Sequence, residues 1–395
     1  MSISRRRTTR LAAAGLAAAL TLTACGGGDS DEGSRAAGSS KENGDITVGV
    51  ALPQSGGSAI LGGPMLNAIK MAVEELNADG GIDGRRVLLS AEDTGADDNS
   101  ALNAFNRLVS DDPAAVVGFP VSTQGFAVMT QVDRTRIPVI MSGTNAKLAS
   151  GSDWAFNWIA NDQTTSTAAV EFAAKKLGYD KIALLRESGE LGTGAAKTVK
   201  AAAEKQGVVV VADEVFQTGE KDLSAQANKL RGGDAQMLFV YGQQADFLVV
   251  SNALATAGVK LPTLLAGLQP QTKAQLNNGG FETIYNRGQC VPSAVKDGKT
   301  AAWAGEYAAK FGSPPTEYAA VAYDGMKLLF AALSEAGTDP EALAKSLAQA
   351  PKTEGVCGVH KGGPEGNLSY TVTIGSYGAD GSYMPAEVLD LAPSD

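Results

Sequence analysis

Three short segments of this chain put hydroxyl, amide or carboxylate groups directly after a stretch that is typical of a buried β-strand. They are residues 118–123 (GFPVST), 141–145 (MSGTN) and 241–246 (YGQQAD). Ser122, Thr123 and Thr144 offer hydroxyls next to backbone N–H groups that can hold an anion at a helix N-terminus. Asp246 offers a carboxylate. Each of these polar residues, taken singly, is more often a helix N-cap. Together, two anion-binding loops and one acid fit a zwitterion such as an amino acid.

The elements that carry these segments follow an alternating pattern. Strand-like stretches are expected at 46–51, 87–91, 114–118, 137–141, 181–186, 208–215 and 237–241. Helical patterns run from Pro64 to the Gly80 stop, and over 99–109, 124–135, 165–177, 194–205, 224–230 and 246–257. Alternation of this kind indicates parallel sheets with helices on both faces. Such sheets bind ligands at the carboxyl ends of their strands, which is where the three polar segments lie.

The length of this pattern exceeds one sheet, and it restarts after Thr164. We therefore predict an α/β fold with two doubly wound parallel-sheet lobes. Residues 368–374 and 382–391, on either side of 378–381, are expected to form an extended hairpin. We expect a loop over 52–63 that contains Leu61.

The N-terminus has the pattern of a secretory signal. Four arginines precede an apolar run over 11–20, and small residues lead to Cys25, which three glycines follow. This resembles a bacterial lipobox, in which the cysteine is acylated and anchors the protein to a membrane. The run is too short for a transmembrane helix. We predict a signal peptide over 1–24 and a lipidated Cys25 with a flexible tether over 25–44. General and twin-arginine export both remain open.

Composition limits the possible functions. The chain has 395 residues, a formal net charge of -10 and no basic run after the expected leader, which argues against a nucleic-acid partner. Besides Cys25, only Cys290 and Cys357 remain, and outside the cytoplasm such a pair is expected to form a disulfide. The single histidine, His360, lies in a Gly/Lys-rich stretch and is expected in an exposed loop. We expect no metal, cofactor or catalytic residues.

Several motifs together resemble a known family, the solute-binding proteins of branched-chain amino-acid type ABC importers, which have the type I periplasmic binding fold. The matching stretches are 46–50 with 53–57, 72–85 (AVEELNADGGIDGR), 116–118, 137–140, 175–178 and 318–324. The resemblance implies three crossovers that form a hinge between the lobes. Lobe I is then expected over 45–162 plus 291–365, and lobe II over 163–290 plus 366–395.

The resemblance also implies roles for residues of the candidate site. Ser122 and Thr144 would hold the carboxylate of an amino-acid ligand, and the carbonyl of Gly143 would accept its ammonium. Asp246 would neutralise the ammonium, although family members often have the longer Glu there. The chain departs from the family at Leu61 and Leu191, where many members place Tyr near the ligand. These two leucines either line an altered side-chain pocket or pack in the core.

The leading hypothesis is a lipid-anchored, monomeric receptor on the outer face of the bacterial cytoplasmic membrane. It would close on an amino acid or similar solute and deliver it to an ABC permease. A sensor of the same fold is an alternative, as is a binder of an amide, urea or aromatic acid. An enzyme is disfavoured because the chain has no G-x-S-x-G elbow, metal-ligand cluster or phosphate-binding loop.

Overall fold

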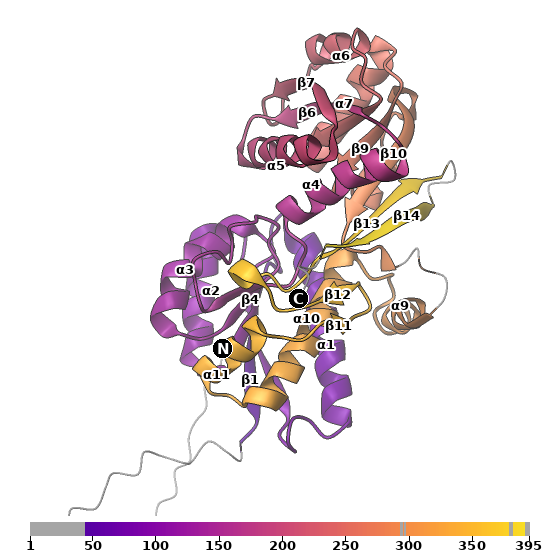
Figure 1. Ribbon diagram of the computed structural model, residues 1–395. Coiled ribbons are helices and arrows are strands. Elements are labelled where there is room, and N and C mark those ends of the chain that lie inside the picture. The colour runs from indigo at the N-terminus through magenta and orange to yellow at the C-terminus, as the bar shows by residue number, and fades with distance from the viewer. Residues whose placement is uncertain (1–43, 293–294, 296–297, 379–381, 392–395) are drawn as a thin grey trace, which may run out of the picture. The chain divides into compact units, whose positions relative to one another are not determined.

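The computed structural model describes residues 44–292, 295, 298–378 and 382–391. The expected signal peptide, Cys25 and most of the tether lie outside the described residues. Within the described part, two separate sheets form two lobes (Figure 1), which confirms the predicted fold class.

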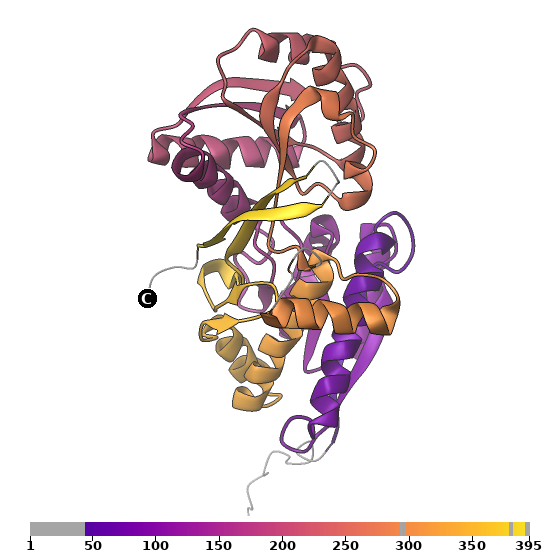
Figure 2. The same ribbon diagram turned by 90° about the vertical axis from the view of Figure 1, so that its right-hand side faces the viewer.

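The first lobe is built on a five-stranded parallel sheet of order β2-β1-β3-β4-β5. Its strands are β1 Ile46–Leu52, β2 Val87–Asp93, β3 Ala115–Gly118, β4 Val139–Met141 and β5 Ala155–Asn157. Its helices are α1 Ala59–Ala78, α2 Asp98–Ser110, α3 Ser122–Thr135, α9 Gly298–Phe311, α10 Glu317–Ala336 and α11 Pro340–Ala348. Helices α1, α9, α10 and α11 share one apolar core with the sheet, while α2 and α3 share another. Helices α1 and α10 run side by side in both views (Figures 1 and 2).

The second lobe has a seven-stranded sheet of order β14-β13-β10-β9-β8-β6-β7. Its strands are β6 Lys181–Glu187, β7 Val209–Phe216, β8 Met237–Tyr241, β9 Leu261–Ala266, β10 Phe281–Gly288, β13 Thr371–Tyr377 and β14 Tyr383–Asp390. Its helices are α4 Asp162–Glu171, α5 Glu190–Gln206, α6 Ser224–Arg231, α7 Gln244–Ala257 and the short α8 Pro270–Lys273. The strands from β6 to β10 are parallel, and β13 and β14 join as the predicted antiparallel hairpin.

The chain passes between the lobes three times. The first passage lies between β5 and α4, the second between β10 and α9, and the third precedes β13. A small hairpin of β11 (Thr353–Glu354) and β12 (Val359–His360) lies before the third passage.

Helices α1 and α5 begin four or more residues earlier than the sequence predicted. Helix α1 starts at Ala59, so Leu61 lies in its first turn rather than in a loop, and Pro64 is inside the helix. The glycines in this turn suggested a loop, but a side chain at Gly62 would collide with the carbonyl of Pro53. Glycine at this position therefore lets the helix pack closely against the backbone of Pro53. Helix α5 starts at Glu190, which puts Leu191 in its first turn.

The expectation that His360 is exposed is wrong. Its side chain is buried, and its Nε2 lies 3.1 Å from Oδ2 of Asp324 on α10. The flanking glycines and lysines gave a polar local pattern, but β12 folds this residue against the first-lobe core. A buried imidazole needs a polar partner, and Asp324 supplies it.

The structure pairs Cys290 with Cys357. Their Cα atoms are 5.3 Å apart, which is within the range that a disulfide requires. The bond joins the start of the second passage to the turn between β11 and β12. It closes a loop that contains α9, α10 and α11, all of which belong to the first lobe.

Candidate functional site

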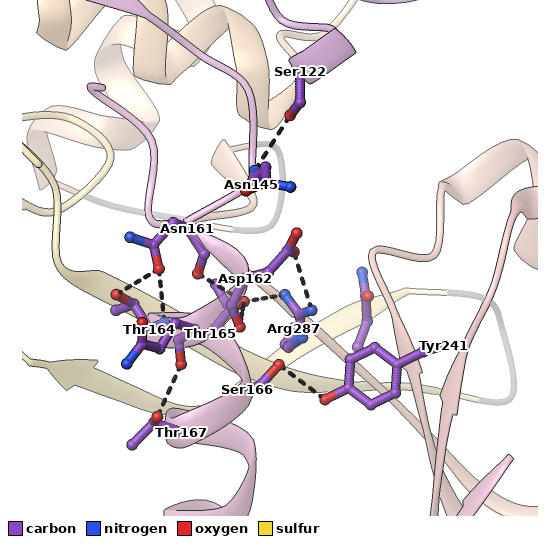
Figure 3. A network of polar contacts seen from close by, with 12 residues as sticks. Ser122, Asn145, Asn161, Asp162, Thr164, Thr165, Ser166, Thr167, Tyr241 and Arg287 are labelled. Carbon is purple, nitrogen blue, oxygen red and sulfur yellow. Dashed lines mark hydrogen bonds and ion pairs between the residues drawn. The ribbon is translucent and has the colours of Figure 1, made fainter. Parts of the chain in front are cut away.

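The carboxyl ends of β3, β4 and β5 bring three polar loops together in the first lobe. Ser122 is the first residue of α3, directly after the β3 loop. Its Oγ accepts a hydrogen bond from the backbone N–H of Asn145, in the β4 loop, at 3.2 Å (Figure 3). Adjacent parallel strands end at the same edge of a sheet, so their loops meet there.

The close approach of these loops depends on glycine at position 143. A Cβ atom added to Gly143 would lie 2.7 Å from the Ser122 Oγ and 2.7 Å from the Leu148 Cδ2. Neither contact is possible without movement of the neighbouring atoms. Gly143 therefore allows the two loops to pack directly against each other.

Further hydrogen bonds fix the β4 loop on both sides. The Ser142 hydroxyl donates to the carbonyl of Gly118 at 2.8 Å. The carbonyl of Gly143 accepts from the Asn157 side-chain amide at 2.9 Å. The carbonyl of Thr144 accepts from the backbone N–H of Asp162, the first residue of α4, at 2.7 Å. The loop is thus held by β3, by β5 and by the first passage between the lobes.

Asp162 lies beside this edge at the start of α4, where the first passage enters the second lobe. Its Oδ1 is 3.6 Å from Nη2 of Arg287 on β10 (Figure 3), and a quarter of its side-chain surface (25%) remains accessible. Burial raises the pKa of the Asp162 carboxyl, while the Arg287 guanidinium and the Thr144 hydroxyl oppose that rise. Asp162 is thus a partly accessible carboxylate beside Thr144.

Arg287 and Tyr241 form the buried layer beneath Asp162. The guanidinium of Arg287 donates to the Thr165 hydroxyl and lies 5.5 Å from the centre of the Tyr241 ring. The Tyr241 hydroxyl donates to Ser166 on α4 at 3.1 Å (Figure 3). The Arg287 Nε is buried with no hydrogen-bond partner. This layer connects α4 with the carboxyl ends of β8 and β10.

Asp246 has a different environment at the edge of the second lobe. It is 2% exposed, and it lies in the first turn of α7. Its Oδ2 accepts the backbone N–H of Gln243 at 2.8 Å, and its Oδ1 accepts that of Gly219 at 3.1 Å. Asp246 therefore caps α7 and fixes the loop that follows β7.

Glu187, at the end of β6, is arranged in the same way. It is 5% exposed, and it accepts hydrogen bonds from the backbone N–H of Gly192 and from the Thr218 hydroxyl. Both buried acids of this edge thus bond to loops of their own lobe.

The remaining predicted residues lie at the margins. Thr123 is exposed on α3, whereas Leu61 and Leu191 are half-buried in the first turns of α1 and α5. Neither leucine is among the residues of the four apolar cores that the described part of the chain contains. The structure thus joins Ser122 with Gly143 and Thr144, while Asp246 bonds within the other lobe.

Sequence reasoning missed Asp162 and Arg287. A signal for Asp162 existed, because an acid directly after a strand and at the start of a helix is the pattern that drew attention to Asp246. The preceding strand β5 has only three residues and was not recognised. Arg287 carried no local signal, because its importance comes from contacts with α4, more than 100 residues away.

Two kinds of structural feature were not found among the described residues. Within that part of the chain, no cluster of three or more His, Cys, Asp or Glu side chains is arranged to hold a metal ion. None of the helices described there combines the length and hydrophobicity needed to cross a membrane.

Comparison with known proteins identifies the family. The model of the periplasmic binding protein family matches residues 45–381. The chain belongs to this family of non-catalytic, extracytoplasmic solute-binding proteins, and it is not an enzyme.

Individual relatives are distant in sequence but cover most of the chain. Leu/Ile/Val-binding protein homolog 3 of Brucella melitensis is 28% identical over 335 residues, which are 82% of this chain and 89% of that protein. An amino acid binding protein of Pseudomonas aeruginosa is 27% identical over 340 residues, 82% and 87% of the two chains.

Solved structures have the same fold. The substrate-binding protein LivJ of Streptococcus pneumoniae, in complex with isoleucine, superposes with a TM-score of 0.74 at 25% identity, covering 87% of this chain and 99% of its own. A solute-binding protein of Rhodopseudomonas palustris in complex with 3,4-dihydroxybenzoic acid gives a TM-score of 0.73 at 18% identity, covering 88% and 98%.

Proposed function

We propose that this protein captures an amino acid or a similar small molecule and delivers it to the permease of an ABC importer. The observation that carries the proposal is the contact between the Ser122 and Gly143–Thr144 loops beside the partly accessible carboxylate of Asp162. Relatives whose names refer to leucine, isoleucine and valine support the same ligand class.

In this proposal the ligand carboxylate binds the first lobe. The hydroxyls of Ser122 and Thr123 donate to it, together with backbone N–H groups at the start of α3, and the Thr144 hydroxyl turns to it from Asp162. These groups lie on loops that are fixed before ligand arrives, so little ordering entropy is lost on binding.

The ligand ammonium then binds the Gly143 carbonyl and Asp162. The sequence pointed to Asp246 for this charge, but Asp246 is fully buried and its two oxygens accept backbone N–H groups of its own lobe. Asp162 keeps an accessible surface and has the Thr144 hydroxyl beside it. Leu61 and Leu191, half-buried at the start of their helices, supply apolar contacts to the ligand side chain from the two lobes.

A carboxylic acid without an amino group is the second candidate ligand. It is favoured by Arg287, whose positive charge already lies near Asp162 and reduces the need for a second cation. A ligand of this kind would use the carboxylate contacts alone.

The anchor is part of the same proposal. A lipid on Cys25 would hold the binding body at the outer face of the cytoplasmic membrane, close to its permease. Cys25→Ala should release the protein from membranes and leave ligand affinity unchanged, because the body begins well beyond this residue. A variant that fractionates with membranes as tightly as the wild type would contradict the anchor.

Two measurements test the proposed ligand class. Mass spectrometry of small molecules that co-purify with the protein, and a thermal-shift panel of amino acids, their deaminated analogues, amides, urea and aromatic acids, should both identify an amino acid. Saturating ligand at about 100 times its dissociation constant stabilises the folded state by about 2.7 kcal/mol. A panel in which only urea, amides or aromatic acids raise the melting temperature would contradict the proposal.

A further inference from the structure

Gln289, on the second passage between the lobes, bonds to the first passage and to β13, the strand into which the third passage leads. It lies directly after β10, at the start of the second passage, and it is 1% exposed. Its side-chain Oε1 accepts the backbone N–H of Ala160, on the first passage, at 2.8 Å. Its carbonyl accepts a hydrogen bond from the hydroxyl of Thr373, near the start of β13, at 2.9 Å.

The same residue is fixed to the first lobe through the disulfide region. The Gln289 side-chain amide donates to the carbonyl of Cys357 at 3.4 Å, and its backbone N–H donates to the carboxylate of Glu317. Cys357 is bonded to Cys290, and its N–H donates to Asp324 on α10 at 2.7 Å. Asp324 is itself buried.

The first and third passages also bond to each other. The N–H of Leu368 donates to the carbonyl of Asn157 at 2.8 Å, and the Asn161 amide donates to the Asn367 side chain at 2.9 Å. Gln289 connects the second passage to these two. A glutamine suits the position because its side chain has both an acceptor and donors.

We propose that Gln289 is a positioning residue that couples the three passages and thereby limits how far the two lobes can move apart. The Cys290–Cys357 disulfide is the anchor of this coupling, because it fixes both the residue after Gln289 and the carbonyl that Gln289 contacts. The inference rests on the two-lobe fold and on these contacts, and it does not depend on the identity of the ligand.

Hydrogen exchange in the ligand-free protein tests the coupling. Gln289→Met keeps the side-chain length but cannot accept the Ala160 N–H, so exchange at Ala160 should become about tenfold faster. The matched control is Gln236→Met. Gln236 accepts the N–H groups of Asp180 and Lys181 at 2.8 and 2.9 Å, within the second lobe. The control should speed exchange at those residues and leave Ala160 unchanged.

Small-angle X-ray scattering separates positioning from a purely structural role. Gln289→Met should broaden the distribution of interlobe distances, and the Cys290→Ser/Cys357→Ser variant should do the same. Both variants break the same connection, which runs from Ala160 through Gln289 to Cys357. Combining them should therefore add little to the effect of either variant alone. An unchanged Ala160 exchange rate, an unchanged distance distribution, or fully additive effects would each overturn the proposal. If Gln289→Met does not fold, the disulfide variant alone must accelerate Ala160 exchange for the proposal to stand.

Discussion

The carboxyl edges of the two sheets carry similar residue types but use them differently. In the first lobe, Ser122, Gly143 and Thr144 connect neighbouring loops, and Asp162, beside them at the start of α4, retains accessible surface. In the second lobe, Asp246 and Glu187 are buried and bond to other segments of that lobe. In our proposal the first edge receives the ligand, whereas the buried acids of the second edge stabilise that edge.

The comparison of Asp162 with Asp246 is the most informative. Both residues lie in the first turn of a helix that follows a strand. The Asp246 side chain turns back to its own helix and to the 217–219 loop, while the Asp162 side chain faces Arg287. Position in the local pattern is therefore insufficient to assign a ligand contact, and the accessible surface that each side chain retains distinguishes the two acids.

Removing the Asp162 charge should have the largest effect on binding. Asp162→Asn removes the proposed ammonium partner, and loss of one member of such a pair costs about 2–5 kcal/mol, roughly 30- to several-thousand-fold in affinity. Titration calorimetry with the amino acid identified by the thermal-shift panel measures this loss. A melting curve of the ligand-free variant is the control, since Arg287 also loses its partner. An affinity within about twofold of wild type would refute the assignment.

Gly143→Ala should have the next largest effect. The new methyl group would meet the Ser122 Oγ and Leu148 at 2.7 Å, and strain of this kind costs about 1–3 kcal/mol. Affinity should fall about tenfold or more because the two loops separate. Gly305→Ala is the matched control, since its Cβ would meet nothing within 4 Å on the exposed face of α9. Equal effects of the two substitutions would show that close loop packing is not required.

Asp246→Ala should reduce stability more than affinity. Loss of a helix cap costs about 0.5–2 kcal/mol of folding free energy, so the melting temperature of the ligand-free protein should fall. Affinity should stay within about twofold of the wild type. The opposite pattern, an unchanged melting temperature with strongly weakened binding, would show that Asp246 and not Asp162 binds the ligand ammonium.

Replacing Glu317 should change how the stability of the folded protein depends on pH and should leave ligand affinity nearly unchanged. Burial raises its pKa from 4.5 to about 7, although it accepts the N–H groups of Gln289 and Cys290. The folded state therefore holds a proton that the unfolded chain releases near pH 4.5. The stability from this group is fully present below that pH and is lost as the pH rises through 7.

A comparison with Glu317→Gln measures this contribution. The melting temperature of the wild type should fall relative to that of the variant between about pH 4.5 and 7. A difference between the two proteins that stays constant with pH would contradict the raised pKa.

Much of the fold could be predicted because its pattern is local. Alternating buried strands and amphipathic helices identified the two sheets, and the hairpin at the end followed from its own periodicity. Strand β5 was missed because three residues carry too little periodicity. The start of α1 was placed too late because the glycines before Pro64 resemble a loop and Pro64 suits a first helical turn. In α1, tertiary packing overrides this local preference.

The site was only partly predictable for a related reason. Ser122, Gly143 and Thr144 stand out because their type and place after a strand are visible in the sequence. Arg287 and Gln289 do not, because their contacts join residues that are 122 and 129 positions apart. Only the folded chain brings such residues to one place.

The central claim is that Asp162 and the first-lobe loops recognise an amino acid through both of its charged groups. The most direct test is a four-way titration of wild type and Asp162→Asn with the bound amino acid and with its deaminated analogue. The wild type should bind the amino acid far more tightly than the analogue, and Asp162→Asn should largely remove that preference by weakening only the amino acid. If the analogue binds wild type as tightly as the amino acid, or if the substitution weakens both equally, the claim is wrong.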